Sequence, residues 1–344
     1  MALKTTCLGA YPKPDWLPVR DWFQIEEGHT KAGSEVTKLY SATSAEADAE
    51  FEALLDKATG QAVADQVECG IDIVTDGEQR RENYIHYHCR HLNGFDFENL
   101  TRKVLRSGAY ETELPTIRSK VEPAGDHFLD HDWRIAQNFT DHPVKLTVPG
   151  PITIMDTTAN AYYNDDRQLA FDLADALNYE IRALADAGCK HIQVDEPLFA
   201  RKPAEALAYG IDALERCFDG VPDDVTRVVH MCCGYPNHLD DTTYLKADKD
   251  CYFQIADAMD ASSIHQLSLE DAHRHNDLSL FDHFKRITIV FGAIAIAKSR
   301  PNVVYASIGD RDGGLYRSED RGESWTRVND LRTSYWYGNI YVDP

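Results

Sequence analysis

Short apolar runs alternate with amphipathic stretches along most of the chain. The runs are rich in Val and Ile, and most stop at Gly, Pro or an acidic residue, which is typical of buried strands. The stretches between them carry apolar residues at helical spacing, and the clearest stripe, from Leu169 to Leu184, ends before Gly188. The pattern predicts a series of strands at residues 5–9, 71–75, 144–148, 191–194, 228–234, 264–270 and 287–296.

Regular alternation of strand and helix implies a parallel sheet. Acidic, thiol and imidazole groups follow several of the strands, and chemistry gathered at carboxyl ends favours a (β/α)8 barrel over an open sheet. We expect residues 303–308 to take the place of the eighth strand, because an unclosed barrel would expose two edges. Residues 79–140 have no clear period and are interpreted as an excursion that contains a hairpin. Thr43 and Glu46 form a capping box, which predicts a long helix from there to Gly70.

The pattern changes after Arg300. Residues 301–344 combine Gly-rich turns with alternating Val, Tyr and Trp, which predicts β-hairpins and no helix. Residues 318–325 resemble the Asp-box turn of propeller blades in sialidase-like and sortilin-like proteins, but a propeller needs several such blades. We therefore expect an α/β catalytic barrel over residues 1–300 and a β-rich tail over 301–344 that makes the eighth strand atypical or replaces it.

Composition narrows the classes of partner. The 344 residues include 57 acidic and 35 basic ones, a formal charge of -22, which argues against nucleic acid or an anionic membrane as partner. No apolar run reaches the roughly 20 residues of a membrane span, and the N-terminus lacks the regions of a signal peptide, so we expect a cytoplasmic protein. Eight Cys scattered over a long chain predict reduced thiols.

Two successive strand ends carry groups that bind metals. His230 and Cys232 are two residues apart, so on a strand they point the same way and can reach one ion. Glu270 ends the next predicted strand. An imidazole, a thiolate and a carboxylate suit a zinc ion that keeps one position open for substrate. The alternative is a core strand with a buried Cys and a hydrogen-bonded His.

Six short motifs carry a resemblance to a known family. They are residues 8–12, 76–80, 148–153, 192–197, 230–232 and 269–270, in the order and approximate spacing of the catalytic barrel of cobalamin-independent methionine synthase. The resemblance covers residues 3–300 and is greatest for short, single-barrel members. It implies a zinc-dependent S-methyltransferase that converts homocysteine to methionine, with a methyl-folate or a methylcorrinoid protein as donor.

The resemblance also implies roles for single residues. Members bind zinc through a His, two Cys and a Glu, of which His230, Cys232 and Glu270 match three. Glu78 and Asp195 correspond to the residues that hold the ammonium group of homocysteine. For Glu78 the alternative is a surface ion pair with a neighbouring Arg, and for Asp195 a charge that caps the following helix.

The backbone around Gly9 and Ala10 corresponds to the part that meets the substrate carboxylate.

Elsewhere this chain departs from the family pattern. The second Cys ligand is absent from the region that should carry it, and Cys233 is expected to be a poor substitute because adjacent residues on a strand face opposite ways. Thr157 stands where long members stack the pterin on a Trp. Lys298 is the one candidate near the position of the family's proton-handling His.

These departures leave two rival hypotheses open. One is another zinc-dependent alkyl transfer to a thiol, as in the related epoxide-to-coenzyme M transferases, and the other is an inactive hybrid protein. His86 and His88 lie among tyrosines but connect to none of the motifs, so we interpret them as surface or rim residues.

Overall fold

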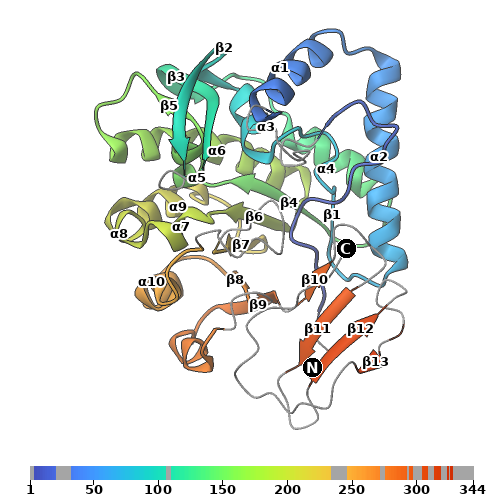
Figure 1. Ribbon diagram of the computed structural model, residues 1–344, viewed down its shortest axis with the longest axis vertical. Coiled ribbons are helices and arrows are strands. Elements are labelled where there is room, and N and C mark those ends of the chain that lie inside the picture. Colours follow the sequence, from blue (N-terminus) through green and yellow to red (C-terminus); the bar gives the residue numbers. More distant parts are fainter. Residues whose placement is uncertain are drawn as a thin grey trace.

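A curled parallel sheet organises the computed structural model, which describes residues 4–20, 32–105, 110–233, 246–271, 276–292, 294–296, 304–308, 314–318, 324 and 326–327. The sheet has six strands in the order β1-β4-β6-β7-β8-β9 (Figure 1). They are β1 (Val74–Thr75), β4 (Val144–Pro149), β6 (His191–Asp195), β7 (Thr226–Met231), β8 (Gln266–Glu270) and β9 (Thr288–Gly292). A parallel bridge from Thr6 to Ile73 continues the sheet beyond β1. The predicted α/β class is confirmed.

Helices follow the strands and pack against the sheet (Figure 1). α6 (Asp166–Ala187) shows why the sequence folds this way: Asp165 accepts hydrogen bonds from its first turn, Gly188 ends it at φ 113°, and its apolar stripe is buried. The other helices are α1 (Ala32–Ala45), α2 (Ala49–Glu68), α3 (Tyr84–Arg90), α4 (Leu129–Gln137), α5 (Pro151–Thr157), α7 (Leu198–Arg201), α8 (Pro203–Glu205), α9 (Ile211–Cys217) and α10 (Cys251–Ala261), with a π-helix at Ala206–Gly210 and a 3₁₀ helix at Leu278–His283. No helix in these described ranges is long and apolar enough to span a bilayer.

The predicted capping box is wrong. The Thr43 hydroxyl donates to the Leu39 carbonyl inside α1, and a break at residues 46–48 separates this helix from α2. Asp48 caps α2 by accepting from the amides of Glu50 and Phe51 at 3.0 and 2.9 Å. Asp is at least as strong an N-cap as Thr, and Asp48 lies directly before the helix that carries the apolar stripe, α2.

A long antiparallel hairpin occupies much of residues 79–140. Its strands are β2 (Leu92–Leu105) and β3 (Tyr110–Pro123), and β5 (Ala159–Asn160) adds a parallel third strand beside β3. The hairpin rises from the sheet next to α1 and α3 (Figure 1).

A second antiparallel sheet follows β9. It consists of β10 (Ile294–Ile296), β11 (Val304–Ile308), β12 (Gly314–Ser318) and β13 (Thr326–Arg327). Strands β11 to β13 match the hairpins predicted after Arg300, whereas the strand predicted at 287–296 is divided between β9 in the parallel sheet and β10 in the second sheet. The expectation that residues 303–308 form an eighth barrel strand is wrong, because β11 runs antiparallel to β10 and pairs with β12 on its other edge. Most of the Asp-box-like segment lies outside the described residues.

Candidate functional site

The loop after β1 presents Glu78 in a left-handed backbone conformation. Its φ is 55°, an uncommon value for a residue with a side chain, and such strain persists only where the surroundings hold it. Lys13 provides that hold, since its ammonium group donates to the carbonyls of Glu78 and Gln79 at 2.8 and 2.9 Å. Asp76 accepts from the Glu78 amide at 3.2 Å. The loop therefore fixes the direction in which the carboxylate leaves the backbone.

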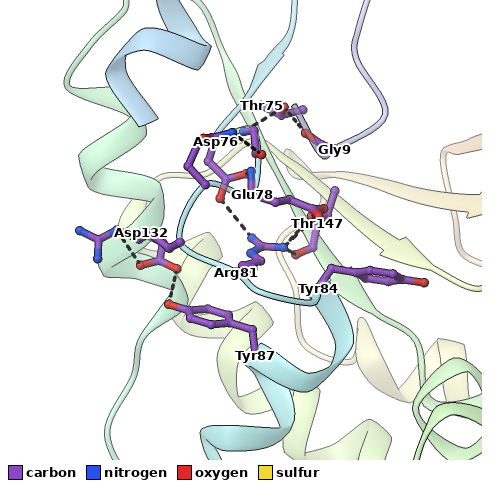
Figure 2. Close-up of polar contacts among 12 residues, drawn as sticks. Gly9, Thr75, Asp76, Glu78, Arg81, Tyr84, Tyr87, Asp132 and Thr147 are labelled. Atoms are coloured by element: carbon purple, nitrogen blue, oxygen red, sulfur yellow. Dashed lines mark hydrogen bonds and ion pairs between the residues drawn. The ribbon is translucent and has the colours of Figure 1, made fainter. Parts of the chain in front are cut away.

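The Glu78 carboxylate is buried against β4. Thr147 Oγ1 donates to its Oε1 at 2.7 Å, and Arg81 Nη1 lies 3.7 Å away (Figure 2). Arg81 is itself locked, donating to the Thr147 carbonyl at 3.0 Å and ion-pairing with Asp76 at 3.3 Å. Burial raises the pKa of Glu78, and the Arg81 charge partly offsets that rise. The ion pair expected as the alternative exists, but it is buried and shared with β4.

The N-terminal segment packs directly on this carboxylate. A Cβ at Gly9 would lie 2.7 Å from Glu78 Oε1 and 2.9 Å from Thr147 Cγ2, so only Gly fits. Thr75 Oγ1 donates to the Gly9 carbonyl at 2.7 Å, and Ala10 bridges to Gly77. Gly9, Ala10 and Glu78 are thus brought together, as expected.

Asp195 ends β6 beside the same edge of the sheet. It is buried, and Gln193 Nε2 donates to its Oδ1 at 2.7 Å. Burial and the nearby Glu78 charge raise the pKa of Asp195 to about 8. The helix-capping alternative is wrong, because α7, the helix that follows, has no side-chain cap. The neighbouring Glu196 accepts instead from the amides of Ile152 and Thr153 at 2.9 and 3.1 Å, at the start of α5.

His230 and Glu270 lie on neighbouring strands further along the sheet. His230 is buried on β7, its Nδ1 pairs with Ser268 Oγ on β8 at 3.1 Å, and burial lowers its pKa to about 3, so the imidazole is neutral. β7 ends at Met231, so the two following Cys lie beyond the strand. Strand alternation does not apply there, and Cys233 Sγ donates to Glu270 Oε2 at 3.0 Å. The argument from strand alternation against Cys233 is therefore wrong, and its role as a zinc ligand is not decided by this contact.

The donor types fit zinc better than their arrangement does. Neutral imidazole, thiolate and carboxylate are the groups that zinc binds. Across the described ranges, however, no three His, Cys, Asp or Glu side chains gather closely enough to hold one ion. His230, Cys232 and Glu270 stay predicted ligands, and Lys298 lies outside the described residues.

Sequence reasoning missed Tyr84. It opens α3, where the Asn83 side chain accepts from the Ile85 amide at 2.8 Å, and its ring points away from Arg81 (Figure 2). Burial raises the pKa of Tyr84 well above its usual value, and the nearby charges of Asp195 and Cys232 add to that rise. The phenol therefore lies within electrostatic reach of both the acidic and the thiol groups. Tyr84 follows the motif 76–80 by only four residues, but it was grouped with the neighbouring stretch of Tyr and His, which has no clear period.

The two histidines of α3 are not at the surface. His86 and His88 are both 1% exposed, so their interpretation as rim residues is wrong. His86 Nε2 pairs with the Thr157 carbonyl at 3.2 Å, and His88 Nδ1 with the Tyr84 carbonyl at 2.7 Å. Both imidazoles are kept neutral, because burial lowers their pKa.

Comparison with known proteins decides the family. The catalytic domain of the cobalamin-independent synthases matches residues 29–300. The chain belongs to this family. Curated proteins similar to this chain include two methionine synthases. The one from Sulfolobus acidocaldarius is 32% identical over 69% of this chain and 63% of the relative. The one from Saccharolobus solfataricus is 33% identical over 67% of this chain and 63% of the relative. The alignment thus spans less than two thirds of each relative's length.

Solved structures similar to this chain support the same family and fold. A B12-independent methionine synthase from Shewanella sp. W3-18-1, solved with selenomethionine, is 28% identical, with a TM-score of 0.70 over 87% of this chain and 84% of that one. A protein from Listeria monocytogenes, 19% identical with a TM-score of 0.54 over 76% of this chain and 75% of that one, shares the fold. The predicted family and barrel class are confirmed.

Proposed function

We propose that this chain transfers a methyl group to the thiol of homocysteine and so forms methionine. The observation that carries the proposal is the buried pair of Glu78 and Asp195 beside the Gly9 backbone. Two carboxylates in a water-poor site suit a cation that donates several hydrogen bonds, such as an ammonium group. Family membership supports the reaction, and the selenomethionine in the Shewanella relative supports an amino acid of this shape.

A bound ammonium group would also complete the charge balance of the site. In the free protein, burial and the Glu78 charge raise the pKa of Asp195 to about 8, so its carboxyl group is largely protonated at neutral pH. An adjacent cation favours the ionised form and lowers that pKa. Substrate binding is therefore expected to release a proton from Asp195.

Zinc is the proposed cofactor, with His230, Cys232 and Glu270 as ligands and Cys233 as a further thiol next to Glu270. Bound zinc would keep the substrate thiol in its thiolate form, which is the nucleophile. The protein's own groups hold the other end of the substrate, because Glu78 and Asp195 take the ammonium and the N-terminal backbone meets the carboxylate. The substrate sulfur then points towards the ends of β7 and β8.

The donor is proposed to be a methyl-folate or a methylcorrinoid protein. Thr157, at the position of the family's pterin-stacking Trp, turns its hydroxyl back to the Thr153 carbonyl at 2.6 Å and offers no ring. This feature favours the corrinoid. An acidic pocket disfavours coenzyme M as the thiol, because its sulfonate would face buried carboxylates.

The test uses zinc-loaded protein with homocysteine and either methyltetrahydrofolate or methylcobalamin, and it quantifies methionine. We expect methionine from one donor, and at least about tenfold less from Asp195→Asn, which loses a charged hydrogen bond. Asp224→Asn is the matched control, because Asp224 pairs with Lys190 on an exposed surface. Absence of product with both donors, together with no calorimetric binding of methionine, would contradict the proposal.

A further inference from the structure

Two buried polar residues lie one layer below the proposed substrate groups. Lys145 precedes Thr147 by two residues on β4, and Gln193 precedes Asp195 by two on β6. Residues two apart on a strand face the same side, so both side chains point towards the side that carries the substrate groups. Register places Thr147 opposite Gln193. The Lys145 and Gln193 side chains are at most 3% exposed, so their polar groups need partners inside the protein.

Those partners determine the orientation of the Gln193 amide. Lys145 Nζ donates to Gln193 Oε1 at 2.6 Å, and Gln193 Nε2 donates to Asp195 Oδ1 at 2.7 Å and to the Leu8 carbonyl at 3.0 Å. An ammonium group can only donate and a carbonyl can only accept, so the reverse orientation would lose these bonds. Lys145 also donates to the Cys7 carbonyl at 2.7 Å.

We propose that Lys145 is a positioning residue for amino-acid recognition. Through Gln193 it aims the Asp195 carboxylate, and through the Cys7 carbonyl it holds the segment that carries Gly9. One side chain thereby couples the groups proposed for the substrate ammonium to those proposed for its carboxylate. The inference rests on the proposed function, since it takes Asp195 and the Gly9 backbone as parts of the substrate site.

The effect of Lys145 should fall on Asp195 more than on Glu78. Glu78 has its own fixed donors in Thr147 and Arg81, which make no use of Lys145. Within the described part of the chain, the Asp195 carboxylate accepts a hydrogen bond from Gln193 alone. Asp195 also attracts the Lys145 charge, partly offsetting the burial that lowers the pKa of Lys145 to about 8. Loss of Lys145 would free the amide to rotate and remove a buried cation from beside Asp195.

The experiment compares two ligands on the zinc-loaded full chain by calorimetry: methionine, and its analogue without the amino group. Lys145→Met is expected to lower the ratio of methionine affinity to analogue affinity about tenfold, because only methionine uses Asp195. Lys145→Arg should recover part of the ratio by restoring a donor and a charge. Lys190→Met, the same change at an exposed ion pair, should leave the ratio unchanged.

Gln193→Glu keeps the proposal testable if Lys145→Met does not fold. It retains an acceptor for Lys145 but takes away the donor to Asp195, so the same fall in the ratio is expected. If wild type prefers methionine and both variants keep that ratio, the positioning role is overturned while the proposed function stands. If wild type binds neither ligand, the proposed function itself fails. An equal loss for both ligands would show a structural role only and overturn the inference.

Discussion

The two halves of the proposed site compensate buried polarity in opposite ways. The acid half, Glu78 and Asp195, is surrounded by fixed donors from the chain, with Thr147 and Gln193 each giving a hydrogen bond of 2.7 Å. In the ligand half, made of His230, Cys232, Cys233 and Glu270, the imidazole is neutral and a thiol is the donor to the Glu270 carboxylate. Burial lowers the pKa of His230 to about 3, and the Cys233 thiol keeps a proton that it donates to Glu270.

The acid half is therefore pre-formed by the fold, whereas the ligand half must change its protonation when zinc binds. The acid half needs only a cation, and its geometry exists before one arrives. The ligand half must lose thiol protons before it can bind zinc, because thiolates and neutral imidazoles are the ligating forms. The imidazole of His230 already meets that condition. Zinc affinity should therefore rise with pH through the thiols, while ammonium recognition depends on the packing of β4 and β6.

The largest effect is expected from His230→Ala in the ligand half. Loss of an outer partner of a metal ligand costs about 10- to 100-fold in metal affinity, and loss of a ligand should cost more. Zinc content by elemental analysis should fall from stoichiometric to near zero. Ser268→Ala, which removes only the 3.1 Å partner of His230, is the graded control and should stay within the smaller range. Full zinc content in His230→Ala would contradict the assignment of the ligand half as the zinc site.

Asp195→Asn probes the acid half and should leave zinc content unchanged. A hydrogen bond to a charged group contributes about 1.5–3 kcal/mol, so methionine affinity should fall about 10- to 150-fold by calorimetry. Glu78→Gln should act in the same direction. A loss of zinc in Asp195→Asn would mean that the two halves are not independent, and the contrast between them would break.

The sequence predicted the site best where each group follows a strand. Gly9, Glu78 and Asp195 occur in motifs at strand ends, and the carboxyl ends of parallel strands meet at one edge, so their proximity followed from the barrel. Lys145 and Gln193 gave no such signal. They sit in the middle of strands that read as apolar, and the bond from Lys145 to Cys7 spans 138 residues of chain. Partners at that separation depend on strand register, which a single sequence does not specify.

Local rules failed where an element ended. Cys233 was rejected by strand alternation, yet β7 stops at Met231, so alternation sets no direction for the Cys233 side chain. His86 and His88 were assigned to the surface because their stretch of Tyr and His has no clean period. Packing of α3 between β4 and the long hairpin buries both. Tertiary contacts decided each of these positions.

A pH dependence of stability gives a smaller test of the acid half. The pKa of Asp195 is about 8 in the fold against a usual 3.8, so from about pH 4 to pH 8 the unfolded chain releases a proton that the fold keeps. The stability of the folded state therefore falls with rising pH in that window, by up to about 1.4 kcal/mol per pH unit from this group. Urea unfolding at pH 5 and pH 7 should show a smaller decline for Asp195→Asn than for wild type. Equal declines would contradict the assigned direction.

The smallest effect is expected where the two halves meet, at Tyr84. Its hydroxyl feels the charges of both Asp195 and Cys232, and its raised pKa keeps it a proton donor at every accessible pH. Tyr84→Phe removes one neutral hydrogen-bonding group, which contributes about 0.5–1.5 kcal/mol, so methionine affinity should fall about two- to tenfold. Tyr179→Phe is the matched control, because the Tyr179 hydroxyl donates to the Gly125 carbonyl at 2.7 Å and takes no part in the proposed site. It should change neither methionine affinity nor zinc content. If Tyr84→Phe lowers methionine affinity but not zinc content, the phenol belongs to the acid half; if both fall, it links the thiol to the acids and the two halves act as one.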